Sequence, residues 1–398
     1  MSLVPETAWH NGAARFRTEI AVFSGPALFC IPIGLLSVWL QGFEFGTQNN
    51  VFHIPIVLRW YDLAQFANDP FIQSLRDYAT PVYPFLSLFT DQSSIGAVFL
   101  GALLLARIMT FFALYQIMRA CGLRTPWLLG AVTAAVFVSA IYGETVISRD
   151  ELLVNFFTHT TLAQAVALLG IACLIRGDPV RASIAAGLAF DLNAMVGVWA
   201  IAPIGLVCLA SPATAPLTRA GSALRVAAAF TLTASPVLLW ILTLDKFSAP
   251  DFDFRAYLAD YYPYHFFIGW AHWPQRITFL LQLLSGLVAA ALLPRNRGKA
   301  ALALLGFTLV FGAGILVGQI SHSRFLLTLH LMRADGMVLW VAVALVMSAA
   351  FTAISGSRIV SMPTGIATIA GLIANDWRIV LAGMLLLAMA ETMFVMPA

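Results

Sequence analysis

The chain has 398 residues, of which 60% are hydrophobic and only 10% are charged, and its formal net charge is +3. A mean hydropathy of +0.87 excludes an ordinary soluble protein, because so few charges cannot shield that much apolar surface from water. We therefore expect the lipid bilayer to be the solvent of this chain. The small net charge gives no indication of a nucleic-acid partner.

Apolar stretches recur along the chain, and several approach the roughly 20 residues that cross about 30 Å of hydrocarbon as a helix. They lie at 20–40, 95–118, 277–293, 300–320 and 337–353. With the weaker stretches included, the pattern predicts an all-α, polytopic membrane protein with about twelve transmembrane helices and a single domain over 1–398. The first apolar run starts late and is too long for a signal-peptide core, so we expect no cleavable leader.

The loops between these stretches are sorted by charge. Short loops that are almost free of acid carry arginine and lysine, and the positive-inside rule assigns them to the cytoplasm together with both termini. These basic residues are Arg15, Arg17, Arg119, Arg124, Arg176, Arg181, Arg219, Arg225, Arg295, Arg297, Lys299 and Arg358. The alternate loops hold nearly all the acids and many aromatic residues, so we expect the functional face to be the outer one.

Two polar positions interrupt the apolar stretches. The count of twelve spans requires two short spans that meet at Asp191 and Asn193. A single span through these residues would instead make Asp191 a mid-membrane acid, as in the broken helices of transporters. Arg107 lies well inside the second span, where a charge is costly unless it is paired or hydrated. It is a candidate ligand for a lipid phosphate or the partner of a buried acid.

Two other sets of residues within the spans predict packing and no chemistry. Gly314 and Gly318 form a GxxxG pair, which is typical of close helix packing. The four cysteines show no metal-ligand spacing, and we interpret them as small apolar packing residues. They are Cys30, Cys121, Cys173 and Cys208.

The first outer loop, 41–94, is long enough to be more than a connector, because loops of this length in compact proteins are usually functional or disordered. Its many aromatic residues favour packing, and their spacing predicts short interfacial helices at the membrane surface. Acidic and basic residues stand among them, a combination that suits a general base, a metal site or a phosphate clamp. They are Glu44, His53, Arg59, Asp62 and Asp69.

The segment Gly42-Phe43-Glu44-Phe45-Gly46, directly after the first span, resembles the start of the GT-C glycosyltransferases. In the protein O-mannosyltransferases of that superfamily an acid closely followed by Phe-Gly stands here and serves as base or metal ligand. The resemblance implies this role for Glu44. Phe43 stands where those enzymes carry a second acid, so a two-carboxylate site would need Asp62 or Asp69. Residues 47–71 are also similar to a group of uncharacterised bacterial GT-C-like membrane proteins.

The resemblance implies a GT-C-like fold in a bacterial inner membrane, with the active face toward the periplasm. Such an enzyme takes a sugar from a polyprenyl-phosphate-type donor, and Glu44 or Asp69 would deprotonate the acceptor. Arginine suits the donor phosphate because its fork matches the oxygen geometry. The arginines expected at the outer face are Arg59, Arg149, Arg324 and Arg333. The carboxylates are compatible with Mg²⁺ or Mn²⁺, although no ligand spacing requires a metal and no metal ligand is assigned.

Two further outer loops supply candidate substrate-binding residues. The second reads Glu144-Thr-Val-Ile-Ser-Arg149-Asp150-Glu151 and is followed by His159 at the mouth of the next span. The third, 244–275, is rich in aromatic residues around His265. An aromatic belt at the headgroup level explains part of that loop. A sugar platform or a polyprenyl groove, with His265 near the phosphate, explains it equally well.

Two other functions stay open on the sequence. A transporter or flippase for a lipid-linked or anionic solute predicts an inverted repeat and several polar mid-membrane residues, and no convincing repeat is present. A non-catalytic subunit for the assembly of an envelope polysaccharide would use the same fold without a reaction. The expected partners are a lipid-linked sugar donor and membrane lipids.

Overall fold

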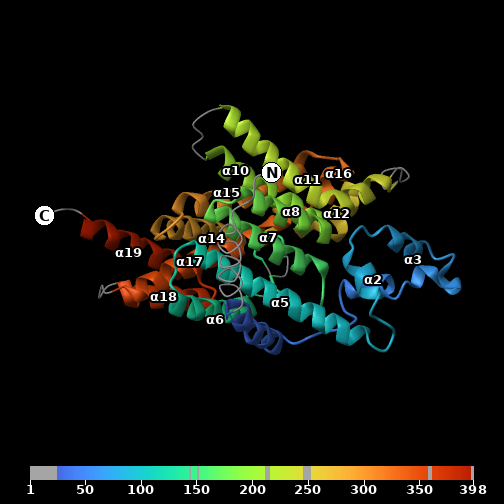
Figure 1. Cartoon of the computed structure of the whole chain (residues 1–398), viewed down its shortest axis with the longest axis horizontal. Helices are drawn as coiled ribbons and strands as arrows, with labels where there is room; N and C mark the ends of the chain where they lie inside the picture. The colour runs from blue at the N-terminus through green and yellow to red at the C-terminus, as the bar shows by residue number, and fades with distance from the viewer. Residues whose placement is uncertain are drawn as a thin grey trace, which may run out of the picture.

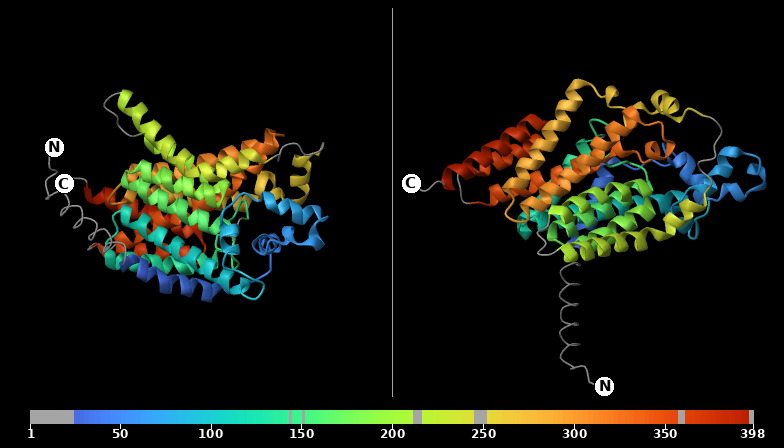
Figure 2. Two further views of the ribbon diagram at one scale, coloured as in Figure 1. Left: turned by 45° about the vertical axis from the view of Figure 1, so that its right-hand side comes forward. Right: turned by 90° about the horizontal axis from the view of Figure 1, so that it is seen from above.

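The computed structural model describes residues 25–142, 145–149, 152–210, 216–244, 252–356 and 361–395. Every regular element in these ranges is a helix, which confirms the all-α prediction. Long helices form an elongated bundle, and a lobe of short helices lies at one end of it, around α2 and α3 (Figure 1). Figure 2 shows the same lobe projecting from the bundle in two further views.

Within the described ranges, six apolar helices are long enough to cross a membrane, so the chain has the architecture of a multi-pass membrane protein. They are α5 (Ile95–Ala120), α7 (His159–Arg176), the Ala220–Thr243 part of α11 (Pro216–Thr243), α14 (Trp273–Leu292), α15 (Arg297–Ile320), and the stretch Arg324–Ser355, which ends in α17 (Asp335–Ser355). The prediction of about twelve spans depends on shorter apolar helices. These are Gly25–Gln41, α6 (Thr125–Ile141), α9 (Ala194–Trp199) with α10 (Ile201–Ala210), and α18 (Ser361–Ile373). Two more helices complete the bundle, α8 (Pro179–Leu192) and α19 (Trp377–Val395).

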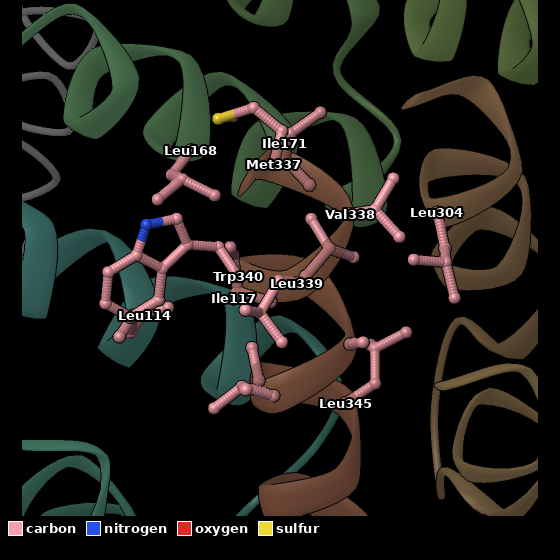
Figure 3. Close-up of a cluster of buried hydrophobic side chains, with 14 of the residues drawn as sticks. Leu114, Ile117, Leu168, Ile171, Leu304, Met337, Val338, Leu339, Trp340 and Leu345 are labelled. Atoms are coloured by element: carbon pink, nitrogen blue, oxygen red, sulfur yellow. The ribbon is translucent and has the colours of Figure 1, made fainter. Parts of the chain in front are cut away.

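Helix α17 is the centre of the bundle. Its residues 335–350 are all buried, and a helix that is apolar all round belongs in a core. It packs against α5, α6, α7, α14, α15 and α18. Figure 3 shows Trp340 of α17 beside Leu114 of α5 and Leu168 of α7, while Val338 projects from the other side of α17 toward Leu304 of α15. All four cysteines are free, and Cys30 and Cys121 are buried in or near this core.

The loops meet in two groups at opposite ends of the bundle. At one end the basic loops after α5, α7 and α14 contact one another. Asn296 Nδ2 donates to the Ala120 carbonyl at 2.8 Å, and the Arg176 guanidinium donates to Gln116. At the other end the first and second outer loops meet, since the Glu44 N–H donates to the Asn155 carbonyl at 2.8 Å. This arrangement agrees with the charge sorting of the sequence.

Asp191 lies at the end of a helix. Helix α8 stops at Leu192, and Asn193 begins α9 as its N-cap, with its side chain accepting from the Met195 N–H. Thr80 of the first outer loop donates its hydroxyl to the Leu192 carbonyl at 2.8 Å. The break between α8 and α9 is therefore level with the outer loops, as two short helices meeting at a tip require.

The first outer loop folds into short helices around a small core of its own, as its aromatic residues predicted. The helices are α2 (Asn50–Val57), η1 (Trp60–Asp62), η2 (Ala64–Phe66), α3 (Pro70–Ser74), η3 (Leu75–Asp77) and α4 (Val82–Ser87). Tyr83 is fully buried there, against Phe99 of α5 and Phe157 of the second outer loop. The later outer segments add α12 (Phe254–Tyr261), α13 (Pro263–Phe266), η4 (Ile268–Trp270), α16 (Arg324–Thr328) and η5 (Leu331–Ala334).

Candidate functional site

A cavity of about 350 Å³ lies where the outer segments converge, and we call it the outer pocket. Its volume is typical of a site for a small ligand or headgroup. Three of the predicted substrate-binding residues, Arg149, His265 and Arg333, line it together. The other lining residues are Gln48, Asn49, Val154, Phe156, Thr158, Thr160, Thr161, Gln164, Tyr262 and Tyr264.

The first turns of α7 form one wall of the outer pocket. Thr160 and Thr161 both lie next to Gln164 on the surface of this helix, because Gln164 follows them by four and three residues. Thr158 is the N-cap, and its hydroxyl accepts from the Thr160 N–H at 3.4 Å. The N-terminal end of an 18-residue helix carries a partial positive charge, so this wall favours an anion.

The backbone next to Arg149 is held in place by a buried carboxylate, that of Asp335. Its φ of 51° is left-handed, which is uncommon for a residue with a side chain. The preceding residue, Ser148, donates its N–H to Asp335 Oδ2 at 2.9 Å and its hydroxyl to Asp335 Oδ1 at 2.6 Å. Asp335 is only 2% exposed and begins α17, two residues after Arg333. One acid thus ties together the two segments that carry the arginines.

His265 is bonded to the same loop, and this bond defines its tautomer. Its Nδ1 lies 2.9 Å from the Ser148 carbonyl oxygen. A carbonyl can only accept, so Nδ1 must carry the proton. In the neutral ring the acceptor lone pair is then on Nε2. Ser148 is therefore held by Asp335 on its N–H and hydroxyl and by His265 on its carbonyl.

The GxxxG pair of α15 supports two walls of the outer pocket. A Cβ at Gly318 would collide with the Phe266 carbonyl oxygen, and one at Gly314 would collide with the backbone of Met332. Phe266 follows His265 in the chain, and Met332 precedes Arg333. The predicted packing role of these glycines is confirmed, but their partners are the loops of the pocket and not a second long helix.

His159 lies behind the pocket wall and is 7% exposed. Asn193 Oδ1 accepts the Met195 N–H at 3.1 Å, so its Nδ2 faces His159 Nε2, 3.3 Å away, as a donor. Nε2 is therefore an acceptor, and Nδ1 donates to the Tyr83 hydroxyl at 2.9 Å. These hydrogen bonds connect the first outer loop to α7 and to the start of α9. His159 therefore has a structural role in the fold.

His53 is fully buried beside this cluster, and its ring stacks on Tyr83 with 4.5 Å between ring centroids. Burial lowers the pKa of His53 well below its ordinary value, and nearby His159 adds to the effect. Burial also raises the pKa of Tyr78, while the charge of Arg333 acts in the opposite direction. His53 does not line the outer pocket.

Three other predicted residues lie in the lobe and do not line the outer pocket. Arg59 pairs with Asp62 at 2.7 Å, and Asp62 also pairs with Arg76 at 3.1 Å, on exposed surface where such pairs contribute about 0–1 kcal/mol. Asp69 is the N-cap of α3, and its Oδ1 accepts from the Ile72 N–H at 3.0 Å. Arg59 also borders a second, more open cavity of about 330 Å³.

Glu44 does not line the outer pocket but lies next to one of its lining segments. The backbone of Glu44 bonds to Asn155, between the lining residues Val154 and Phe156, and its Oε2 accepts from the Thr47 hydroxyl at 3.3 Å. Glu44 is exposed at the rim of the pocket, and its catalytic role stays a prediction.

Arg107 and Arg324 are held by other parts of the bundle. Arg107 is fully buried in α5 and donates to the Val154 carbonyl at 2.5 Å, which holds the pocket wall from behind. The guanidinium of Arg324 lies 5.5 Å from the ring centroid of Phe254, a cation–π distance.

The sequence reasoning missed the polar wall of α7. Thr160, Thr161 and Gln164 repeat at helical spacing within an apolar span, and that signal was available in the sequence. Three acids of the second outer loop, Glu144, Asp150 and Glu151, lie outside the described residues. Among the described residues no group of three His, Cys, Asp or Glu side chains is placed to hold a metal ion.

Comparison of this chain with protein families, curated proteins and solved structures finds no match.

Proposed function

We propose that the chain is a membrane glycosyltransferase of GT-C type, which moves a sugar from a polyprenyl-phosphate-type lipid donor to an acceptor. The observation that carries the proposal is the lining of the outer pocket. Two arginines meet amides, hydroxyls and two tyrosines at the N-terminal end of α7. A lining of this kind suits a ligand that is both anionic and rich in hydroxyls, and a sugar phosphate has both properties.

The roles follow from the chemistry of each side chain. Arg149 and Arg333 bind the phosphate, because guanidinium groups form charge-assisted and often bidentate bonds with its oxygens. Gln164 and the threonines of α7 bind sugar hydroxyls. Tyr262 and Tyr264 offer aromatic faces to the sugar ring and phenol oxygens to its hydroxyls.

The proposal includes a location, the bacterial inner membrane with the pocket on the periplasmic side. The basic loops gather at the end of the bundle opposite the pocket, which supports this orientation through the positive-inside rule. A lipid donor in the outer leaflet would then bring its headgroup to the level of the outer pocket.

The test is binding and turnover by the purified chain in nanodiscs, with polyprenyl-phosphate-linked mannose, glucose and arabinose as donors. We expect sugar transfer or slow donor hydrolysis by the wild type, lost in Arg149→Gln and Arg333→Gln but kept in Arg181→Gln, a control at an exposed arginine that pairs with Asp178 outside the pocket. Glu44→Gln and Asp69→Asn test the two carboxylates predicted as bases.

Two results would contradict the proposal. Tight donor binding without chemistry would favour a carrier or an assembly subunit, and absence of donor binding would remove the lipid-sugar premise.

A further inference from the structure

We propose that His265 is the general base of the outer pocket and takes the proton of the acceptor hydroxyl on Nε2. This inference deepens the proposed function and depends on it. It is carried by a chain of hydrogen bonds that runs from the buried Asp335 through Ser148 to the imidazole ring.

The first step is the position of the ring. His265 lines the outer pocket together with Arg149 and Arg333, whereas Glu44 lies at the rim and Asp69 caps α3 in the lobe. A general base must reach the proton that it removes, within hydrogen-bond distance or through one water. Of these groups, His265 shares a cavity with the two cations assigned to the phosphate.

The second step is the protonation state. The Ser148 carbonyl accepts from Nδ1 at 2.9 Å, which makes Nδ1 the proton-bearing nitrogen and Nε2 the basic one. A neutral imidazole with one nitrogen anchored by a hydrogen bond is the usual arrangement of a catalytic histidine.

The third step is rigidity. Asp335 accepts both the N–H and the hydroxyl of Ser148, so the carbonyl that orients His265 is fixed by a buried carboxylate. Behind the next residue, Phe266, α15 presents Gly318 without room for a side chain. Asp335 and Gly318 are positioning residues in this scheme, because they act on His265 through Ser148 and Phe266.

The reaction balances without a further reactant. Nε2 accepts the proton of the acceptor O–H, and the acceptor oxygen forms a bond to the anomeric carbon of the sugar. The bond from that carbon to the phosphate oxygen breaks, and its electron pair leaves with the lipid phosphate, next to Arg149 and Arg333. The imidazolium then passes its proton to the released phosphate or to water.

Two substitutions of the same residue separate a base from a structural anchor. In His265→Asn the side-chain amide takes the place of Nδ1 and can still donate to Ser148, but nothing replaces Nε2. In His265→Gln the amide reaches the place of Nε2, and the donor to Ser148 is lost. A purely structural histidine would tolerate asparagine and not glutamine, whereas a general base tolerates neither.

The experiment measures the Kd for sugar-free polyprenyl phosphate and the kcat for the donor that the wild type turns over, in nanodiscs. For His265→Asn we expect a Kd within about twofold of wild type and a kcat lower by about 10²–10⁴-fold, the usual contribution of general base catalysis. Unchanged phosphate binding shows that the variant is folded.

Three outcomes would overturn the inference. Turnover near the wild-type rate in His265→Asn overturns the assignment of the base alone. A loss of turnover in Glu44→Gln with normal turnover in His265→Asn moves the base to Glu44. Absence of turnover by the wild type with every donor overturns the proposed function together with this inference.

Discussion

Replacing Gly318 of α15 by alanine is expected to destabilise the protein through the loop that carries His265. The added Cβ would collide with the Phe266 carbonyl oxygen, and a backbone atom cannot rotate away as a side-chain tip can. Overpacking of this kind costs about 1–3 kcal/mol. Alanine also gains about 1 kcal/mol of helix propensity over glycine, which partly masks the collision.

Gly312→Ala on the same helix is the matched control, because a Cβ there meets nothing within 4 Å. The gain in helix propensity cancels between the two variants, so their difference in the free energy of unfolding isolates the collision. We expect Gly318→Ala to unfold about 1–3 kcal/mol more easily than Gly312→Ala. Titration of SDS into mixed micelles, followed by tryptophan fluorescence, measures this difference. Equal stability of the two variants would refute the close approach of α15 to the His265 loop.

Three other predictions concern the pocket and the lobe. Arg149→Gln or Arg333→Gln should weaken binding of polyprenyl phosphate by about 10–100-fold, since a hydrogen bond to a charged group contributes about 1.5–3 kcal/mol. An unchanged Kd in an equilibrium titration would exclude contact between these arginines and the phosphate. In the folded protein the pKa of His53 is well below its ordinary value, so the unfolded chain takes up a proton at higher pH than the folded one, and the free energy of unfolding should fall as the pH drops below about 6.5. His53→Phe should reduce this dependence of the free energy of unfolding on pH. An unchanged dependence would contradict the account. Asp69→Ala should destabilise the lobe by about 0.5–2 kcal/mol through the lost N-cap of α3, and loss of turnover in a folded variant would add a catalytic role.

The helical architecture could be predicted from the sequence because it depends on local properties. Apolar length and charge sorting identified long helices and the grouping of loops, and the aromatic residues of 41–94 predicted a folded lobe. The number of spans is harder to obtain, because helices such as α8 are too short to stand out. The break at Asn193 was one of two open alternatives, and the bond from Thr80 to Leu192 decides for a helix tip.

The outer pocket is less predictable, because it joins segments that are far apart in the chain. Arg149, His265 and Arg333 were candidates for the chemistry of their side chains, but nothing local indicates that they share one cavity. Ser148 illustrates the difficulty. Its neighbours in sequence say nothing about Asp335, which is 187 positions later and determines its conformation. Contacts of that range depend on the packing of the whole bundle.

Asp335 also affects the outer pocket through its negative charge, apart from its hydrogen bonds to Ser148. The isosteric substitution Asp335→Asn tests this effect. Arg149 and Arg333 line one cavity, where like charges repel each other. The Asp335 carboxylate is bonded to Ser148, the residue before Arg149, and lies two residues after Arg333, so we expect it to offset part of that repulsion. Asp335→Asn keeps the shape, because the amide oxygen still accepts from the Ser148 N–H and the serine hydroxyl can turn to accept from the amide nitrogen. Only the negative charge is lost. A negative charge near the two arginines is then lost, so stability should fall while affinity for inorganic phosphate or polyprenyl phosphate should rise. The opposite signs distinguish this effect from general damage to the pocket, which would lower both quantities. Unchanged phosphate affinity and stability in a folded Asp335→Asn variant would show that Asp335 acts only through its hydrogen bonds to Ser148.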